Sequence, residues 1–162
     1  WRFEALALAA HLEYLQKVCW KSQLTVSLPR LRPAAGEYEP QHPLGDREFI
    51  QLICSLRVTF PMVGIVLSTR EPAPLRDLLA PMGITMMSAG SHTEPGGYTG
   101  QGREALHLTV KGKIVPDSGG DAATEQFSIS DVRDARSIEN LLTQLGLDPV
   151  WKDWDSGILG AA

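Results

Sequence analysis

Hydrophobic positions in the first part of the chain follow two different spacings. Apolar residues recur with a period of about 3.6 residues within residues 2–18 and again within residues 49–60, which predicts two amphipathic helices. Short apolar runs rich in branched side chains predict buried strands at residues 24–28, 63–67 and 83–87. A further short helix is expected before Pro81. Helices and strands therefore alternate along the chain.

This alternation predicts an α/β fold with a parallel sheet, because each helix can connect two strands by a right-handed crossover. The strands do not alternate strictly between apolar and polar residues, a pattern typical of strands buried on both faces. Two architectures fit: an open doubly wound sheet, or part of a (β/α)8 barrel. In the helix predicted from the apolar period within residues 49–60, Asp46 is expected to be the N-cap, with Glu48 in the first turn.

The pattern changes after residue 100. Residues 101–123 are expected to form an insertion, and alternating residues around Lys111 and Gly112 predict a β-hairpin within it. Residues 124–162 then hold a helix that ends near Gly146 and a tail, in which "PVWKDWD" is a possible last strand. Residues 1–100 are expected to form the preceding β/α units.

Composition narrows the classes of function that the chain can have. The 162 residues carry a net charge of −4, which argues against nucleic acid as the main partner, and no apolar run is long enough to span a membrane. The two cysteines, Cys19 and Cys54, fall in helical patterns and are expected to be buried thiols of a cytoplasmic protein. The four histidines show no metal-ligand spacing. The chain begins with Trp1, which indicates the back part of a longer protein.

Polar residues follow each predicted strand at its C-terminal end, where α/β proteins bind ligands. These residues are Arg30 and Arg32 after the first strand, Ser68, Thr69 and Arg70 after the second, and Ser88, Ser91, His92 and Thr93 after the third. The guanidinium of Arg70 suits a small carboxylate, with the hydroxyls of Ser68 and Thr69 as further donors. The alternative is a salt bridge from Arg70 to Glu71, Asp77 or a helix end.

Arg30 and Arg32 alternate on an extended backbone, so both can point toward one ligand. In the alternative, one of them faces solvent and the other pairs with an acid such as Glu37. The glycine-rich loop after "MMSAGS" can approach a ligand or phosphate closely, or it can be a structural turn.

Five blocks of the sequence together resemble the C-terminal part of the 2-iminoacetate synthase family. They are "WKSQLTVSLPRLRPAAG", "GIVLSTREPAPLRD", "GITMMSAGSHTEPGGY", "EQFSISD" and "GLDPVWKDWD", in the family's order. The resemblance implies the last strands of a radical S-adenosylmethionine (radical-SAM) barrel of the TIM type, with parallel strands, followed by a C-terminal extension.

The resemblance also implies a chemistry. Members of the family use S-adenosylmethionine and a 4Fe–4S cluster to cleave tyrosine to 2-iminoacetate and p-cresol during thiamine biosynthesis, and they deliver the imine to thiazole synthase. In related lyases the arginine of the Ser-x-Arg strand end holds the carboxylate of the amino acid, a role that falls here on Arg70, with Ser68 and Thr69 beside it. Looser substrate or cofactor roles fall on residues after the first and third strands, namely Arg30, Arg32, Ser88, Ala89 and Gly90.

Two departures from the family pattern qualify these expectations. The family's cluster motif, Cys-x3-Cys-x2-Cys, is absent, so the cluster ligands should lie outside this chain and the isolated chain should be inactive. Residues 101–123 stand where a short link is expected. A fragment of a barrel would also leave a strand edge unpaired, which favours self-association.

Three other interpretations remain open. One is the related tyrosine lyase of hydrogenase cofactor maturation. The second is a non-catalytic docking or anion-binding module derived from the same barrel. The third is an ordinary doubly wound domain that binds a phosphorylated ligand at its strand ends.

Overall fold

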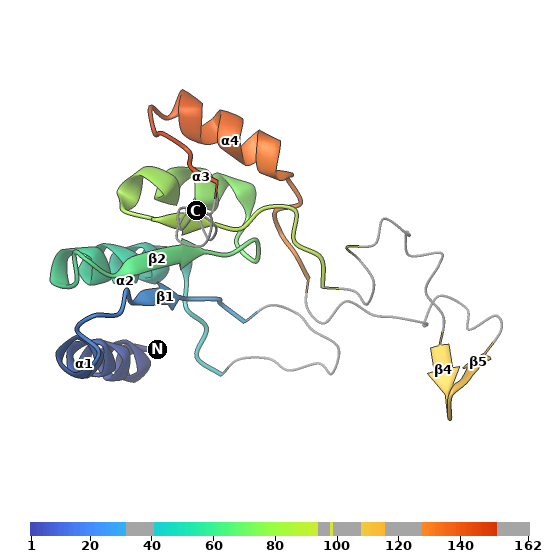
Figure 1. The fold of residues 1–162 in the computed structure, drawn as a ribbon, viewed down its shortest axis with the longest axis horizontal. Helices are drawn as coiled ribbons and strands as arrows, with labels where there is room; N and C mark the ends of the chain where they lie inside the picture. Colours follow the sequence, from blue (N-terminus) through green and yellow to red (C-terminus); the bar gives the residue numbers. More distant parts are fainter. Residues whose placement is uncertain (32–40, 94–97, 99–107, 116–127, 152–162) are drawn as a thin grey trace, which may run out of the picture.

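A computed structural model describes residues 1–31, 41–93, 98, 108–115 and 128–151. Three parallel strands form one sheet in the order β1-β2-β3 (Figure 1). The strands are β1 (Thr25–Ser27), β2 (Gly64–Leu67) and β3 (Met86–Met87). The connecting helices are α1 (Arg2–Val18) before β1, α2 (Asp46–Thr59) before β2, and α3 (Ala73–Leu79) with the 3-10 turn η1 (Ala80–Met82) before β3. The predicted α/β alternation is therefore confirmed, although β3 is shorter than its apolar run.

The hydrophobic core lies between the helices and one face of the sheet. Val26 of β1 pairs in register with Ile65 of β2, and Ile65 and Leu67 are buried on the same side. The core cluster adds helix residues, namely Leu12 of α1, Phe49, Ile53 and Leu56 of α2, and Leu75 and Leu79 of α3. Periodic apolar positions of the helices thus meet alternate positions of the strands.

The opposite face of the sheet is less covered. Thr25 and Ser27 of β1 are exposed on it, and Val66 of β2, which pairs with Met86, is only half-buried. Burial on both faces is found in β2, where Gly64, Ile65 and Leu67 are buried and Val66 is half-buried, but not in β1, which alternates between exposed and buried residues. Helices on one side only are typical of a barrel wall, whereas a doubly wound sheet is covered on both faces.

The hairpin predicted around Lys111 and Gly112 is confirmed. Residues Leu108–Val110 (β4) and Lys113–Val115 (β5) form an antiparallel hairpin in which Val110 pairs with Lys113. Lys111 and Gly112 both have positive φ angles, of 50° and 76°, as a two-residue turn of this handedness requires. The division of the chain at residues 101–123 remains a prediction.

The last described helix, α4 (Ala135–Gln144), is capped at both ends. The Asp134 side chain accepts a hydrogen bond from the amide of Ser137 at 2.8 Å. Gly146, at φ 74°, reverses the chain, and its amide and that of Leu147 donate to the carbonyls of Thr143 and Leu142. Gly146 therefore ends the helix as predicted. Residues 149–151 after it are not a strand, and the rest of "PVWKDWD" lies outside the described residues.

Two sequence expectations about side chains were wrong. Asp46 does not cap α2: it is the first helical residue, Gly45 is the N-cap, and the Asp46 carboxylate pairs with Arg30 instead. Cys54 is exposed and Cys19, at the end of α1, is half-buried, so they are not two buried thiols. The helical spacing of these residues did not show which side of α1 and α2 packs against the core and which side is exposed to solvent.

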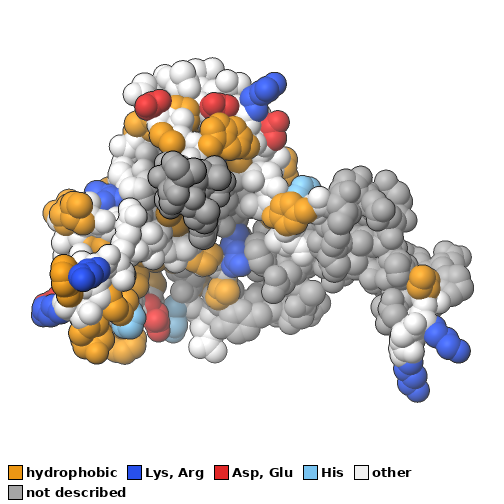
Figure 2. All heavy atoms as spheres, viewed as in Figure 1, with side chains coloured by type: hydrophobic (Ala, Val, Ile, Leu, Met, Phe, Trp, Pro, Cys, Tyr) orange, Lys and Arg blue, Asp and Glu red, His pale blue; other side chains and the backbone are white. Residues whose placement is uncertain are grey.

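Helix α1 also carries an apolar outer surface. Phe3, Leu6, Tyr14 and Val18 each expose more than half of their surface, and Figure 2 shows hydrophobic side chains gathered over this helix. Within the described part of the chain, no helix is long and apolar enough to cross a membrane.

Candidate functional site

The C-terminal end of β2 turns sharply into α3. The amide of Glu71 donates to the carbonyl of Ser68 at 3.3 Å, and the amide of Arg70 donates to the Ser68 Oγ at 3.2 Å. Pro72 is the N-cap of α3, so the chain must change direction between Leu67 and Pro72. The Ser68 hydroxyl keeps its own proton for donation, because it serves this turn as an acceptor.

Burial alternates along this turn. Thr69 is 3% exposed and Glu71 is 1% exposed, whereas Ser68 and Arg70 are half-buried. The turn is therefore anchored by Thr69 and Glu71 and presents Ser68 and Arg70 nearer to solvent. This is an arrangement in which a guanidinium and a hydroxyl from one turn can reach the same small anion.

Arg30 joins the end of β1 to this turn. Its Nε donates to both carboxylate oxygens of Glu71 at 3.0 Å, and its Nη2 also donates to Glu71. Its Nη1 donates to the Asp46 carboxylate at 2.7 Å and to the Leu44 carbonyl at 3.1 Å. We call Arg30, Asp46 and Glu71 the Glu71 cluster.

A further interaction fixes the guanidinium of Arg30. It lies 4.7 Å from the ring centroid of the buried Phe49, within cation–π range. The hydrogen bonds that Arg30 donates to Glu71 raise the pKa of Arg30, with Asp46 adding to the effect and burial opposing it. Arg30 therefore stays charged and is held by acids of its own chain.

A second group of charged side chains lies near the C-terminal ends of β2 and β3. Arg76 of α3 is completely buried and donates to the Asp131 carboxylate and to the Ser88 carbonyl. Arg133 donates to Asp131 at 2.7 and 2.9 Å and to Asp77 at 2.7 Å. We call Arg76, Asp77, Asp131 and Arg133 the Asp131 cluster.

The pKa values of this cluster show opposing effects. Burial raises the pKa of Asp131, but hydrogen bonds from Arg133 and Arg76 more than offset it and hold the pKa at about 2. Burial lowers the pKa of Arg76, against the attraction of Asp131, while bonds to Asp131 and Asp77 raise that of Arg133. The two carboxylates and two guanidinium groups form a charge-balanced unit.

The segment that contains Asp131 is bound to the strand ends by its backbone. The amides of Ser130 and Asp131 donate to the Thr69 carbonyl at 3.0 and 3.1 Å. The amide of Gly90 donates to the Arg133 carbonyl at 3.0 Å. Residues far along the chain thus secure the turn that carries Arg70.

The structure brings most of the predicted site residues to one edge of the sheet. Arg30, Ser68, Thr69 and Arg70 gather at the ends of β1 and β2, and Ser88, Ala89 and Gly90 follow β3, where the Ser88 amide donates to the Leu67 carbonyl. Arg32 lies outside the described residues. Of the acids suggested as partners of Arg70, Glu71 pairs with Arg30 and Asp77 with Arg133.

Sequence reasoning missed the residues that support this edge. Arg76, Asp131 and Arg133 were not assigned a role, and Glu71 was considered only as a partner of Arg70. Arg76 lies between Leu75 and Leu79 on the apolar side of α3, and a charge at such a position is a signal that a buried partner exists. No sequence pattern indicated Asp131 as that partner.

The cluster chemistry implied by the resemblance does not fit this chain. A 4Fe–4S cluster of the family's type needs three thiolates, and the chain has two cysteines, one in α2 and one after α1. Among the residues that the structure describes, no group of three metal-ligating side chains occurs. The two cysteines of this chain therefore cannot supply the thiolates of such a cluster.

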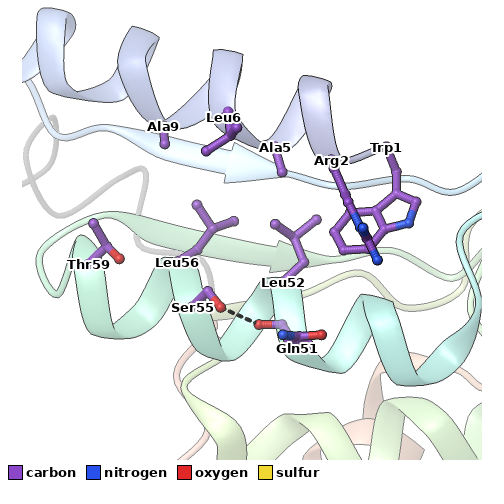
Figure 3. Close-up of a pocket in the computed structure, with 10 residues that line it drawn as sticks. All are labelled: Trp1, Arg2, Ala5, Leu6, Ala9, Gln51, Leu52, Ser55, Leu56 and Thr59. Carbon is purple, nitrogen blue, oxygen red and sulfur yellow. Dashed lines mark hydrogen bonds between the residues drawn. The ribbon is translucent and has the colours of Figure 1, made fainter.

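A separate cavity of about 360 Å³ lies between α1 and α2. Figure 3 shows apolar side chains of both helices pointing into it, with the Ser55 hydroxyl bonded to the Gln51 carbonyl. Its lining comes from the two helices and the N-cap residue of α1, namely Trp1, Arg2, Ala5, Leu6, Ala9, Gln51, Leu52, Ser55, Leu56 and Thr59. The strand-end residues are not part of it.

The parallel sheet, its helix cover on one face and the charged strand ends define an α/β protein with a candidate anion site at the C-terminal edge. The chain belongs to the Biotin and Thiamin Synthesis associated domain family, whose model matches residues 27–148. It is 39% identical to 2-iminoacetate synthase of Escherichia coli strain K12 and 38% identical to that of Salmonella typhimurium, over 156 residues in each case. These alignments cover 96% of this chain but 36% of each relative.

Two solved structures have the same fold. An X-ray structure of the FeFe-hydrogenase maturase HydG from Carboxydothermus hydrogenoformans matches with a TM-score of 0.67 and 34% identity, over 90% of this chain and 29% of that one. A second crystal structure of HydG matches with a TM-score of 0.75 and 26% identity, over 98% of this chain and 30% of that one. The predicted fold, part of a radical-SAM barrel, is confirmed.

Proposed function

We propose that this chain is part of a 2-iminoacetate synthase, a radical-SAM lyase that converts tyrosine to 2-iminoacetate and p-cresol. The observation that carries the proposal is the 39% identity to the Escherichia coli enzyme over 96% of the chain. The description of the matching family, which names thiamin synthesis, also supports the proposal. In this proposal the protein is cytoplasmic, and its imine product passes to thiazole synthase for the thiazole of thiamine.

The part of the reaction that we assign to this chain is the binding of tyrosine. Arg70 binds the carboxylate with its planar pair of donors, and the Ser68 hydroxyl adds a hydrogen bond. The buried Thr69 supports them through its backbone, whose carbonyl accepts two amides. Ser88, Ala89 and Gly90 remain candidates for contact with tyrosine or S-adenosylmethionine, and so does Arg32.

The radical chemistry comes from S-adenosylmethionine and a 4Fe–4S cluster, which we place on residues outside this chain. What these residues do is hold the amino acid in one orientation and neutralise its carboxylate. The 162-residue chain alone should then form no 5′-deoxyadenosine from S-adenosylmethionine. Formation of that product by the isolated chain would contradict this assignment.

The substitution Arg70→Lys in the full-length protein tests the binding role. It keeps the charge but removes the two-pronged donor, so we expect tyrosine to bind about tenfold more weakly or worse. Equilibrium binding of labelled tyrosine measures the effect, and Arg136→Lys on the exposed side of α4 is the matched control. Unchanged affinity in Arg70→Lys would remove the role from Arg70.

A second candidate is a HydG-type lyase, which the TM-score of 0.75 to HydG favours. Growth of a thiamine-requiring strain without 2-iminoacetate synthase, after introduction of the full-length gene, separates the two. Restored growth supports the thiamine enzyme. Release of p-cresol from tyrosine without restored growth supports the HydG type, and absence of p-cresol supports a non-catalytic module.

A further inference from the structure

One short segment late in the chain joins the two loops that follow β2 and β3. The amides of Ser130 and Asp131 both donate to the Thr69 carbonyl in the turn after β2, at 3.0 and 3.1 Å. The Arg133 carbonyl accepts the amide of Gly90, in the loop after β3, at 3.0 Å. We call the stretch from Ser130 to Arg133 the Asp131 segment. Its backbone is therefore bonded to both loops.

Side chains hold the Asp131 segment in this position. Arg133 donates to the Asp131 carboxylate from Nε at 2.9 Å, from Nη2 at 2.7 Å and from its own backbone amide at 3.1 Å. The same Nη2 donates to Asp77 of α3 at 2.7 Å. The buried Arg76, also from α3, donates to Asp131 and to the Ser88 carbonyl at the end of β3. The Arg133 side chain thus closes the segment on itself and attaches it to α3.

Both joined loops carry residues that we assign to the ligand. Ser68 and Arg70 lie in the turn after β2, and Gly90 lies in the loop after β3. A ligand that contacts both loops binds tightly when their relative position is already set, because ordering a loop during binding costs affinity. The link runs through the carbonyl of Thr69 and the amide of Gly90, so it sets this position without using a side chain of either loop.

We propose that Arg133 is a positioning residue for ligand binding: through Asp131 and its own carbonyl, it holds the loop after β3 in place relative to the turn after β2. Arg133 need not touch the ligand in this role. The inference rests on the proposed function, in which these loops contact an α-amino acid, either tyrosine or S-adenosylmethionine. A purely structural bond would change the fraction of folded protein and leave the affinity of the folded fraction unchanged.

The first test is Arg133→Gln in the full-length protein, at a temperature where circular dichroism shows every variant folded. Equilibrium binding of labelled tyrosine and of labelled S-adenosylmethionine is measured separately. We expect the ligand that contacts the loop after β3 to bind about fivefold more weakly, while the fold remains intact.

Arg57→Gln is the matched control for this substitution. Arg57 lies at the opposite ends of the same two strands, where it donates to the carbonyls of Pro61 before β2 and Gly83 before β3, at 2.6 to 3.0 Å. Its loss should destabilise the fold and leave both affinities within about twofold of the wild type. Equal losses of affinity in Arg57→Gln and Arg133→Gln would overturn the inference in favour of a structural role.

The second test changes the other partner of the link. Gly90→Ala and Gly146→Ala each place a side chain at a positive φ, of 56° and 74°, and neither new Cβ would meet a described atom within 4 Å beyond its chain neighbours. The two substitutions therefore introduce similar backbone strain. Gly90 is bonded to Arg133, whereas Gly146 is bonded to Thr143 at the end of α4. We expect Gly90→Ala to weaken the same ligand about fivefold and Gly146→Ala to leave both affinities within about twofold.

The double variant Arg133→Gln with Gly90→Ala separates a shared contact from a direct effect of the new methyl group. If both substitutions act through the bond between these residues, the double variant should bind within about twofold of the weaker single variant. Losses that multiply to about 25-fold would show two independent effects and would overturn the link through Arg133.

Arg70→Lys, measured in parallel, reports on the proposed function itself. If Arg70→Lys weakens tyrosine binding while Arg133→Gln weakens neither ligand, the inference fails and the proposed function stands. If Arg70→Lys has no effect, the proposed role of Arg70 fails. A fivefold loss in Arg133→Gln and Gly90→Ala, absent from Arg57→Gln and Gly146→Ala, supports the inference.

Discussion

The two charged clusters at the strand ends are built from the same residue types but differ in burial. In the Glu71 cluster, the Asp46 side chain is 65% exposed. In the Asp131 cluster, the central pair, Arg76 and Asp131, is almost fully buried. An ion pair without contact to water loses more when one partner is removed than a pair whose partner reaches solvent.

The largest effect is expected from the substitution that unbalances the buried cluster. Asp131→Asn leaves Arg76 buried without its counter-charge, so we expect the free energy of unfolding to fall by about 3–5 kcal/mol. Urea denaturation of the protein measures it. Asp134→Asn, three residues away, is the control and should change stability by less than about 0.5 kcal/mol, because asparagine caps helices as well as aspartate does.

The Glu71 cluster should be less sensitive. Arg30→Met is expected to lower the free energy of unfolding by about 2 kcal/mol, since Asp46 and the rim of the cluster remain in contact with water. The double variant Arg30→Met with Glu71→Met should recover to within about 1 kcal/mol of the wild type, because the buried carboxylate is removed together with Arg30 and the remaining Asp46 is exposed to water. A double variant less stable than Arg30→Met alone would show that the ion pair itself is a major source of stability.

Acid should weaken the Asp131 cluster. The pKa of Asp131 is about 2, below its ordinary value of 3.8. A carboxylate with a lowered folded-state pKa stabilises the fold above its unfolded pKa and loses this contribution as pH falls through the folded value. We therefore expect unfolding free energy to decline between about pH 4 and about pH 2, and to decline less in Asp131→Asn. Equal declines in both proteins would contradict the assignment.

The smallest expected effect concerns the aromatic contact of Arg30. A double-mutant cycle of Arg30→Met and Phe49→Leu should give a coupling free energy of about 0.5–1 kcal/mol, the usual size of a partly exposed cation–π contact. The cycle is needed because Phe49 also packs in the core, so its substitution alone mixes two effects. A coupling near zero would show that the 4.7 Å approach contributes little to fixing Arg30.

The sequence predicted what depends on local pattern. Apolar runs gave the three parallel strands, and a polar end on each run gave the edge where Arg30 and Arg70 now lie. Local spacing did not reveal that Asp46 would pair with Arg30 rather than cap its helix, because both uses suit a carboxylate at that position. It also could not pair Arg76 with Asp131, since a partner 55 residues away leaves no periodic signal.

That separation bears on the order in which the protein folds. Closing a loop of 55 residues has an entropic cost that neighbouring contacts do not carry, so the bond between Arg76 and Asp131 should form late, after β1, β2 and their helices have met. A contact absent from the folding transition state affects the unfolding rate rather than the folding rate. The interaction between Asp131 and Arg76 would then determine the lifetime of the folded strand ends, whereas it would hardly change the rate at which they fold.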